Sequence, residues 1–323
     1  MKRREFIAGS AGILAAAIAP GAMAANAWRI GQVFGGTAVT IPSAGLEQGL
    51  QDLGYVNGKN FHLLTRFVAP NPSAMKAAIL DLLPDIDLLI VWGTIGGVAA
   101  KAAAVKIPVV FISVGAPVDI GLVDSLAHPG GNMTGITFEA ASETYGKRLQ
   151  ILKEIVPGLS RAAVLGAKGD PNVPFATASL EQSAKALNVS ISRFEASSTD
   201  DLKSAFDEMR RAQSEAVIVV AGALSYANGN AIADLALSNG LPSCHGFSET
   251  VVAGGLVSLG PNMLELAHQG ARLVEKIISG SRPADIPVEQ PTRYALSINL
   301  KTAKTLGLDV PWFLQQRAEE VIE

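Results

Sequence analysis

Short apolar runs alternate with amphipathic segments along the first half of the chain. Four of these runs have the length and composition of β-strands: 28–34, 61–67, 87–91 and 108–112. Apolar residues at helical spacing follow the first two runs, at 46–53 and 73–83, and an Ala-rich stretch follows the third. Strand–helix steps joined by short loops predict a parallel, doubly wound sheet.

The same pattern restarts near residue 140. After a short run at 135–138, further strands are predicted at 162–165, 189–194, 216–220 and 241–245, with helices at 143–155, 175–187, 200–212 and 226–239. A late helix at 262–279, a Pro-rich crossing at 282–291, a strand at 294–298 and a helical tail complete the chain. We therefore predict two α/β lobes with a cleft between them. The N-terminal lobe comprises 25–139 plus about 260–285, and the C-terminal lobe 140–259 plus about 286–323.

The first 24 residues have the pattern of a cleavable signal peptide. A charged start with Arg3 and Arg4 precedes an apolar run to about Ala19, and Ala22–Ala24 is a small-x-small cleavage site. The alternative is a membrane helix, but a span needs about 20 apolar residues and this run is shorter. The arginine pair resembles a twin-arginine export signal, with the general secretory route as the alternative. We expect export to the periplasm.

Composition narrows the class of protein further. Of 323 residues, 49% are hydrophobic and 17% charged, with a net charge of −3, which excludes a disordered chain. Lys and Arg number 26 against 29 Asp and Glu, so no basic excess favours nucleic acid as a partner. The single cysteine, Cys244, excludes an internal disulfide, and four scattered histidines give no metal-ligand pattern. We expect neither a metal nor a cofactor.

Local catalytic motifs are missing from the sequence. It contains neither a P-loop nor a Gly-x-Gly-x-x-Gly after the first strand, and Gly246–Thr250 lacks the second glycine of a nucleophile elbow. An exported α/β enzyme with a dispersed site remains an alternative, and His245 with Glu249 is its nearest candidate pair.

The carboxyl ends of the predicted strands are the candidate ligand site, because ligands of open parallel sheets bind there. The candidate residues are Phe34, Thr37, Trp92, Gly93, Thr94, Ser113, Gly115, Thr137, Phe138, Asp170, Ala221, Ala223 and Phe247. Thr94 is expected to donate to an anionic ligand group at a helix start, and Trp92, on the same strand face, to form an apolar wall. The alternative is that strand-end glycines only make turns, with Phe34 and Trp92 in the core.

Several segments together resemble the periplasmic substrate-binding proteins of ABC transporters, in the group that includes tryptophan and tyrosine uptake proteins. They are KRREFI (2–7), GLEQGL (45–50), LGYVNGKN (53–60), IPVVF (107–111), GLVDSL (121–126), HPGGNMTG (128–135), GGL (254–256), GPN (260–262), PVEQPT (287–292) and INLKTAK (298–304). The resemblance implies a type I periplasmic-binding fold, in which two Rossmann-like, doubly wound lobes close on a small molecule without catalysis. It also implies a monomer that serves an inner-membrane ABC permease.

The sequence departs from this family at the expected cleft. Many relatives carry Asp or Asn after the strands of the second lobe, where this chain has Ala167-Lys168 and Ala221–Ala223. An amino acid's ammonium would then need Asp170, Glu139 or Glu249, or the ligand lacks an amine. We expect a solute receptor for a small organic ligand, such as an amino acid or aromatic acid. A ligand-sensing receptor module is the further alternative.

Overall fold

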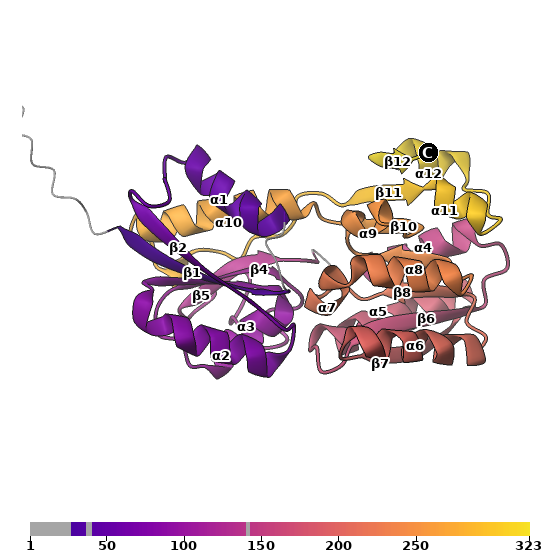
Figure 1. The fold of residues 1–323 in the computed structure, drawn as a ribbon, viewed down its shortest axis with the longest axis horizontal. Helices are drawn as coiled ribbons and strands as arrows, with labels where there is room; N and C mark the ends of the chain where they lie inside the picture. The colour runs from indigo at the N-terminus through magenta and orange to yellow at the C-terminus, as the bar shows by residue number, and fades with distance from the viewer. Residues whose placement is uncertain (1–26, 37–40, 140–142) are drawn as a thin grey trace, which may run out of the picture.

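The computed structural model describes residues 27–36, 41–139 and 143–323, and these form two α/β lobes that lie side by side (Figure 1). The first lobe contains a parallel sheet in the order β2-β1-β3-β4-β5. Its strands are β1 (Trp28–Gly35), β2 (Phe61–Val68), β3 (Leu88–Trp92), β4 (Val109–Val114) and β5 (Met133–Thr137). All five residues of β3 are buried, as a central strand covered on both faces requires.

Helices cover both faces of this first sheet. One layer is made by α1 (Ile41–Asp52) and α10 (Met263–Ile278), and the other by α2 (Pro72–Leu82) and α3 (Gly93–Ala102). The short helices η1 (Leu83–Asp85) and η2 (Pro283–Asp285) flank the sheet. Helix α10 comes from late in the chain, yet it packs along α1 in the first lobe (Figure 1).

The second lobe contains a larger sheet in the order β12-β11-β10-β9-β8-β6-β7. Its strands are β6 (Arg161–Ala167), β7 (Ser190–Ala196), β8 (Ala216–Val219), β9 (Ser243–His245), β10 (Val257–Gly260), β11 (Ala295–Asn299) and β12 (Glu320–Ile322). Strand β11 runs antiparallel to β10, whereas the other neighbours are parallel.

The helices of this lobe again form two layers. They are α4 (Glu143–Ile155), α5 (Asn172–Leu187), α6 (Thr199–Arg211), α7 (Ala223–Ala227), α8 (Gly229–Ser238), α9 (Ser248–Val252), α11 (Leu300–Thr305) and α12 (Trp312–Arg317). One core joins α4 and α5 to the sheet, and the other joins α6 and α8. Helix α7 lies where the second lobe faces the first (Figure 1).

The predicted two-lobe α/β architecture is confirmed, with corrections in the second half. The helix expected at 226–239 is divided at Asn228 into α7 and α8, and α9, β10 and β12 were not predicted. The C-terminal tail, expected to be helical, ends in β12. Glu289 pairs with β5 through bonds to Gly135 and Thr137, so the chain leaves the first lobe a few residues after the expected 286. The expected signal peptide at 1–24 lies outside the described residues.

The chain passes between the lobes three times, between β5 and α4, between β10 and α10, and between η2 and β11. A contact joins the first passage to the third, because the Tyr294 hydroxyl donates to the Phe138 carbonyl at 3.3 Å. Three adjacent connections form a hinge about which two rigid lobes can rotate. In the described ranges, none of the helices is both long enough and apolar enough for a membrane span.

Glycines allow α1 and α10 to approach closely, and this contact fastens the late helix to the first lobe. A Cβ at Gly49 would lie 2.9 Å from the Ala271 Cβ and 3.2 Å from the His268 Cα. We expect Gly49→Val to destabilise the protein by about 1–3 kcal/mol, the usual cost of overpacking. The denaturation midpoint measures this. Gly131→Val is the matched control, because nothing lies within 4 Å of its added Cβ. Equal midpoints for both variants would show that the helix contact is not tight.

Candidate functional site

Five aromatic rings from both lobes meet where the lobes face each other. In the first lobe, Phe34 lies next to the end of β1, Trp92 is the last residue of β3, and Phe138 follows β5. In the second lobe, Tyr226 lies in α7 and Phe247 directly precedes α9. The ring centroids are 5.2 Å apart for Phe34 and Trp92, 6.1 Å for Phe34 and Tyr226, 4.9 Å for Tyr226 and Phe247, and 5.2 Å for Phe247 and Phe138. These rings, which we call the aromatic cluster, connect the two lobes without a break.

The aromatic cluster lines a cavity of about 30 Å3, which lies within about 430 Å3 of space between atoms that includes open solvent. Ten of the sequence-predicted residues line it, namely Phe34, Trp92, Gly93, Thr94, Ser113, Gly115, Phe138, Ala221, Ala223 and Phe247. They converge because both sheets direct the carboxyl ends of their parallel strands toward the gap between the lobes.

Three predicted residues are not part of this lining. Thr37 lies outside the described residues. Thr137 is buried and lines a second cavity, of about 220 Å3, which shares Asn172 with the first. Asp170 is buried behind Gly222, where an added Cβ would lie 2.8 Å from its Oδ2.

The structure adds five lining residues that the sequence analysis did not name. They are Gly35, Asn172, Gly222, Tyr226 and Met263. Asn172, Tyr226 and Met263 belong to the first turns of α5, α7 and α10, a few residues beyond the strand ends. Counting the first helical turn as part of each strand end would have found Asn172 and Tyr226.

Thr94 occupies a different setting from the one expected. The chain turns at Gly93, whose φ is +74°, and α3 begins there, so Thr94 does not continue the strand face of Trp92. Its side chain is buried, and its Oγ1 accepts a hydrogen bond of 3.0 Å from the Gly115 amide. The hydroxyl therefore ties two strand-end loops together at the cavity wall.

Trp92 is positioned by neighbouring side chains, and Ser113 by the local backbone. The Trp92 indole donates to Gln32 Oε1 at 3.3 Å, and Gln32 donates in turn to Thr65 Oγ1 at 3.0 Å. Ser113 has a φ of 64° and lies at a register shift between β4 and β5. A bulge of this kind redirects a side chain, and here Ser113 lines the cavity.

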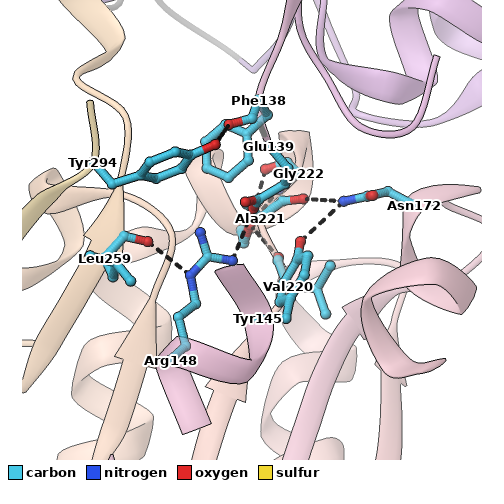
Figure 2. Close-up of polar contacts among 11 residues, drawn as sticks. Phe138, Glu139, Tyr145, Arg148, Asn172, Val220, Ala221, Gly222, Leu259 and Tyr294 are labelled. Atoms are coloured by element: carbon cyan, nitrogen blue, oxygen red, sulfur yellow. Dashed lines mark hydrogen bonds and ion pairs between the residues drawn. The ribbon is translucent and has the colours of Figure 1, made fainter. Parts of the chain in front are cut away.

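Asn172 of the second lobe lies directly against Gly115 of the first. Its Nδ2 donates to the Tyr145 hydroxyl at 3.2 Å and to the Ala221 carbonyl at 3.4 Å (Figure 2). A Cβ at Gly115, across the gap, would lie 2.2 Å from Asn172 Oδ1. Only glycine at position 115 lets the first lobe approach Asn172 this closely.

The Asp170 carboxylate holds the backbone of Asn172 in place. Its Oδ1 accepts a hydrogen bond of 2.9 Å from the Asn172 backbone amide. Burial raises the pKa of the Asp170 carboxyl to about 6, and this single hydrogen bond only partly opposes the shift. The described residues that line the first cavity include no charged side chain.

The candidate catalytic pair, His245 and Glu249, is not assembled at the cavity. The His245 ring is buried, contacts Ser243 Oγ at 2.9 Å, and does not line the cavity. Burial, together with the nearby Arg148 charge, lowers its pKa to about 3, which makes it a poor base. Within the described residues, no group of three or more His, Cys, Asp or Glu is placed to hold a metal ion.

The sequence of this chain is similar to those of known substrate-binding proteins. Residues 30–322 match the family model described as ABC transporter substrate binding protein. The tyrosine-binding protein of Clostridioides difficile is 24% identical over 265 residues, covering 82% of this chain and 76% of that protein.

Solved structures share the fold over almost the full length. The ABC domain from Streptococcus pneumoniae in complex with L-Trp has a TM-score of 0.85 at 20% identity, with coverage of 92% of this chain and 100% of that one. A conserved domain protein from Vibrio cholerae has a TM-score of 0.83 at 24% identity, with coverage of 91% and 98%.

The buried Asp170 carboxyl makes stability depend on pH. Its folded pKa of about 6 exceeds the ordinary 3.8, so the stabilisation from the protonated form is complete below 3.8 and is lost as pH rises through 6. Asp170→Asn keeps an oxygen for the Asn172 amide but carries no charge. We expect its stability relative to wild type to rise by on the order of 3 kcal/mol between pH 4 and 7.

Denaturation midpoints across that pH range measure the difference, with the exposed Asp234→Asn as control. A constant difference between Asp170→Asn and wild type at every pH would contradict the assignment.

Proposed function

Because this chain belongs to the family of ABC transporter substrate-binding proteins, we propose that its aromatic cavity binds a small aromatic carboxylate by closure of the two lobes. The observation that carries the proposal is the aromatic cluster, to which both lobes contribute rings. A flat aromatic ligand packs well against such rings. A ligand that contacts both lobes stabilises the closed state and not the open one.

The polar groups around the rings favour a carboxylate. Thr94 lies in the first turn of α3 beside the cavity, where helix amides and the helix dipole attract negative charge. Each charge-assisted hydrogen bond contributes about 1.5–3 kcal/mol. A few such bonds and one packed ring would reach about −8 kcal/mol, which corresponds to micromolar affinity.

The amine of an amino acid has less support. Among the described residues that line the first cavity none is acidic. Glu139 is paired with Arg148, Asp170 lies behind Gly222, and Glu249 is hydrogen-bonded to the Tyr226 side chain. The tyrosine-binding and L-Trp-bound relatives nevertheless keep aromatic amino acids as candidates. The ligand test must therefore separate aromatic acids with an amine from those without one.

We further propose that the protein is exported and delivers its ligand to a membrane ABC permease. Proteins of this family are typically extracellular or periplasmic and serve such a permease. The Arg3-Arg4 pair and the following apolar run support export by the twin-arginine route.

Ligand class is tested by calorimetry of the purified protein with four compounds. L-tryptophan and L-tyrosine carry an amine, whereas indole-3-propionate and 4-hydroxyphenylpropionate do not. We expect micromolar binding of at least one, with the amine-free compounds equal or tighter. Failure of all four compounds to bind would contradict the aromatic carboxylate assignment.

Thr94→Val tests where the carboxylate binds. With a compound that binds wild type, we expect affinity to fall about ten- to a hundredfold, through loss of about 1.5–3 kcal/mol. Because Val cannot accept from the Gly115 amide, stability should also fall, by about 1–3 kcal/mol. Thr177→Val, which removes a buried hydroxyl outside both cavity linings and should leave affinity unchanged, is the control. Unchanged affinity in Thr94→Val would show that the ligand carboxylate does not bind at Thr94.

Export is tested with the double variant Arg3→Lys and Arg4→Lys. We expect the precursor to stay in the cytoplasm, because the charge is kept but the arginine pair is lost. Fractionation of cells followed by immunoblotting measures the location. Normal delivery to the periplasm would indicate the general secretory route instead.

A further inference from the structure

Arg148 of α4 is the largest side chain that is completely buried in the described part of the chain. Its side chain contacts Glu139 and Leu259, and the close-up also shows the bond from Tyr294 to Phe138 (Figure 2). Glu139 lies in the first passage and Tyr294 in the third, whereas Leu259 is the next-to-last residue of β10, the strand that leads into the second passage. Arg148 is therefore placed at the hinge rather than in the interior of one lobe.

The guanidinium contacts the first passage and the strand that leads into the second. Nη1 lies 3.0 Å from Glu139 Oε1, directly after β5, and Nε donates to the Leu259 carbonyl at 2.8 Å, near the end of β10. A rotation of the lobes changes backbone angles at the ends of these strands. Arg148 therefore makes these contacts in the same arrangement of the lobes that brings the Phe34 ring against the Tyr226 ring.

Arg148 is also linked to the cavity through aromatic rings. Its guanidinium carbon lies 4.6 Å from the Tyr145 ring centroid and 5.8 Å from that of Phe138. Both distances are within the range of cation–π attraction. Phe138 lines the cavity and packs edge-on against Phe247, while the Tyr145 hydroxyl accepts a hydrogen bond from the Asn172 side-chain amide.

Stability alone does not account for this buried pair. Burial raises the pKa of Glu139 although Arg148 opposes this shift, whereas the pKa of Arg148 is raised although its own burial opposes this, chiefly through the Glu139 charge. Apart from the ion pair, neither Nη atom of Arg148 has a hydrogen bond to the described residues, and the Glu139 carboxyl is also hydrogen-bonded by the Thr144 side chain. Such pairs are often replaced by apolar residues without loss of stability.

We propose that Arg148 is a positioning residue, which holds the hinge in the closed geometry and thereby sets Phe138 and Asn172 against the ligand. This inference rests on the proposed binding by lobe closure. One planar group contacts the first passage, the end of β10 and two rings at once, an arrangement that a lysine ammonium cannot reproduce.

The test measures the distance between the lobes without ligand. Fluorophores on Ala77→Cys of α2 and Ser204→Cys of α6 report this distance by energy transfer, since both positions are exposed. Cys244 stays unlabelled, because it is buried and burial raises its pKa to about 12. The variants are Arg148→Lys and the neutral pair Arg148→Met with Glu139→Gln, which leaves no unpaired buried charge.

For the neutral pair we expect a melting temperature near that of wild type but a longer distance between the lobes. For L-tryptophan, or whichever of the four compounds binds, we expect affinity to fall about tenfold as the closed population falls. Arg148→Lys should lengthen the distance in the same way. The control is the same neutral replacement at Arg161 and Glu215, an ion pair of the second lobe outside both cavity linings. It should change neither the distance between the lobes nor the affinity for the compound.

A purely structural role would give the opposite result. If the neutral pair folds with the wild-type distance and wild-type affinity, the proposal is wrong. If the pair does not fold, Arg148→Lys decides by the same two measurements. If wild type binds none of the compounds, the aromatic ligand fails, but the distance in unliganded variants still tests Arg148.

Discussion

The packing of aromatic rings between the lobes is the interaction on which the rest of this structure depends. Phe34 meets Tyr226 across the gap, and the rings on either side extend this contact into both sheets. Large apolar rings at strand ends would be costly to expose in an open cleft. A ligand with an aromatic group can replace ring–ring contacts by ring–ligand contacts, so one set of residues serves both the closed arrangement and recognition.

Close backbone approach and hinge geometry make this packing possible. Gly115 allows Asn172 to reach the first lobe, and Asn172 is held by Tyr145, Ala221 and the carboxyl of Asp170. Arg148 connects the same region to the passages between the lobes. Cavity and hinge are therefore built from neighbouring residues, which is a physical basis for coupling ligand binding to lobe rotation.

The sequence predicted the fold and much of the cavity because both follow local rules. Apolar runs located β1, β3 and β4, and the strand-end rule placed Trp92, Gly115 and Phe247 in one cavity lining. The family resemblance, read from turn and packing segments, is confirmed by the match over 30–322. The short strand β10 and the role of Arg148 were missed because they depend on partners distant in sequence. Thr94 was expected only to donate to a ligand at a helix start, because nothing local reveals its bond to Gly115.

The most direct test of this account is to identify the small molecule that the protein carries. Protein purified under native conditions is denatured, and the released molecules are analysed by mass spectrometry beside the Trp92→Ala variant. We expect an aromatic carboxylate at up to one molecule per chain in wild type and its loss in the variant, because Trp92 lines the cavity. A ligand without an aromatic ring, or equal amounts of ligand in wild type and variant, would contradict the assignment of the aromatic cluster as the binding site.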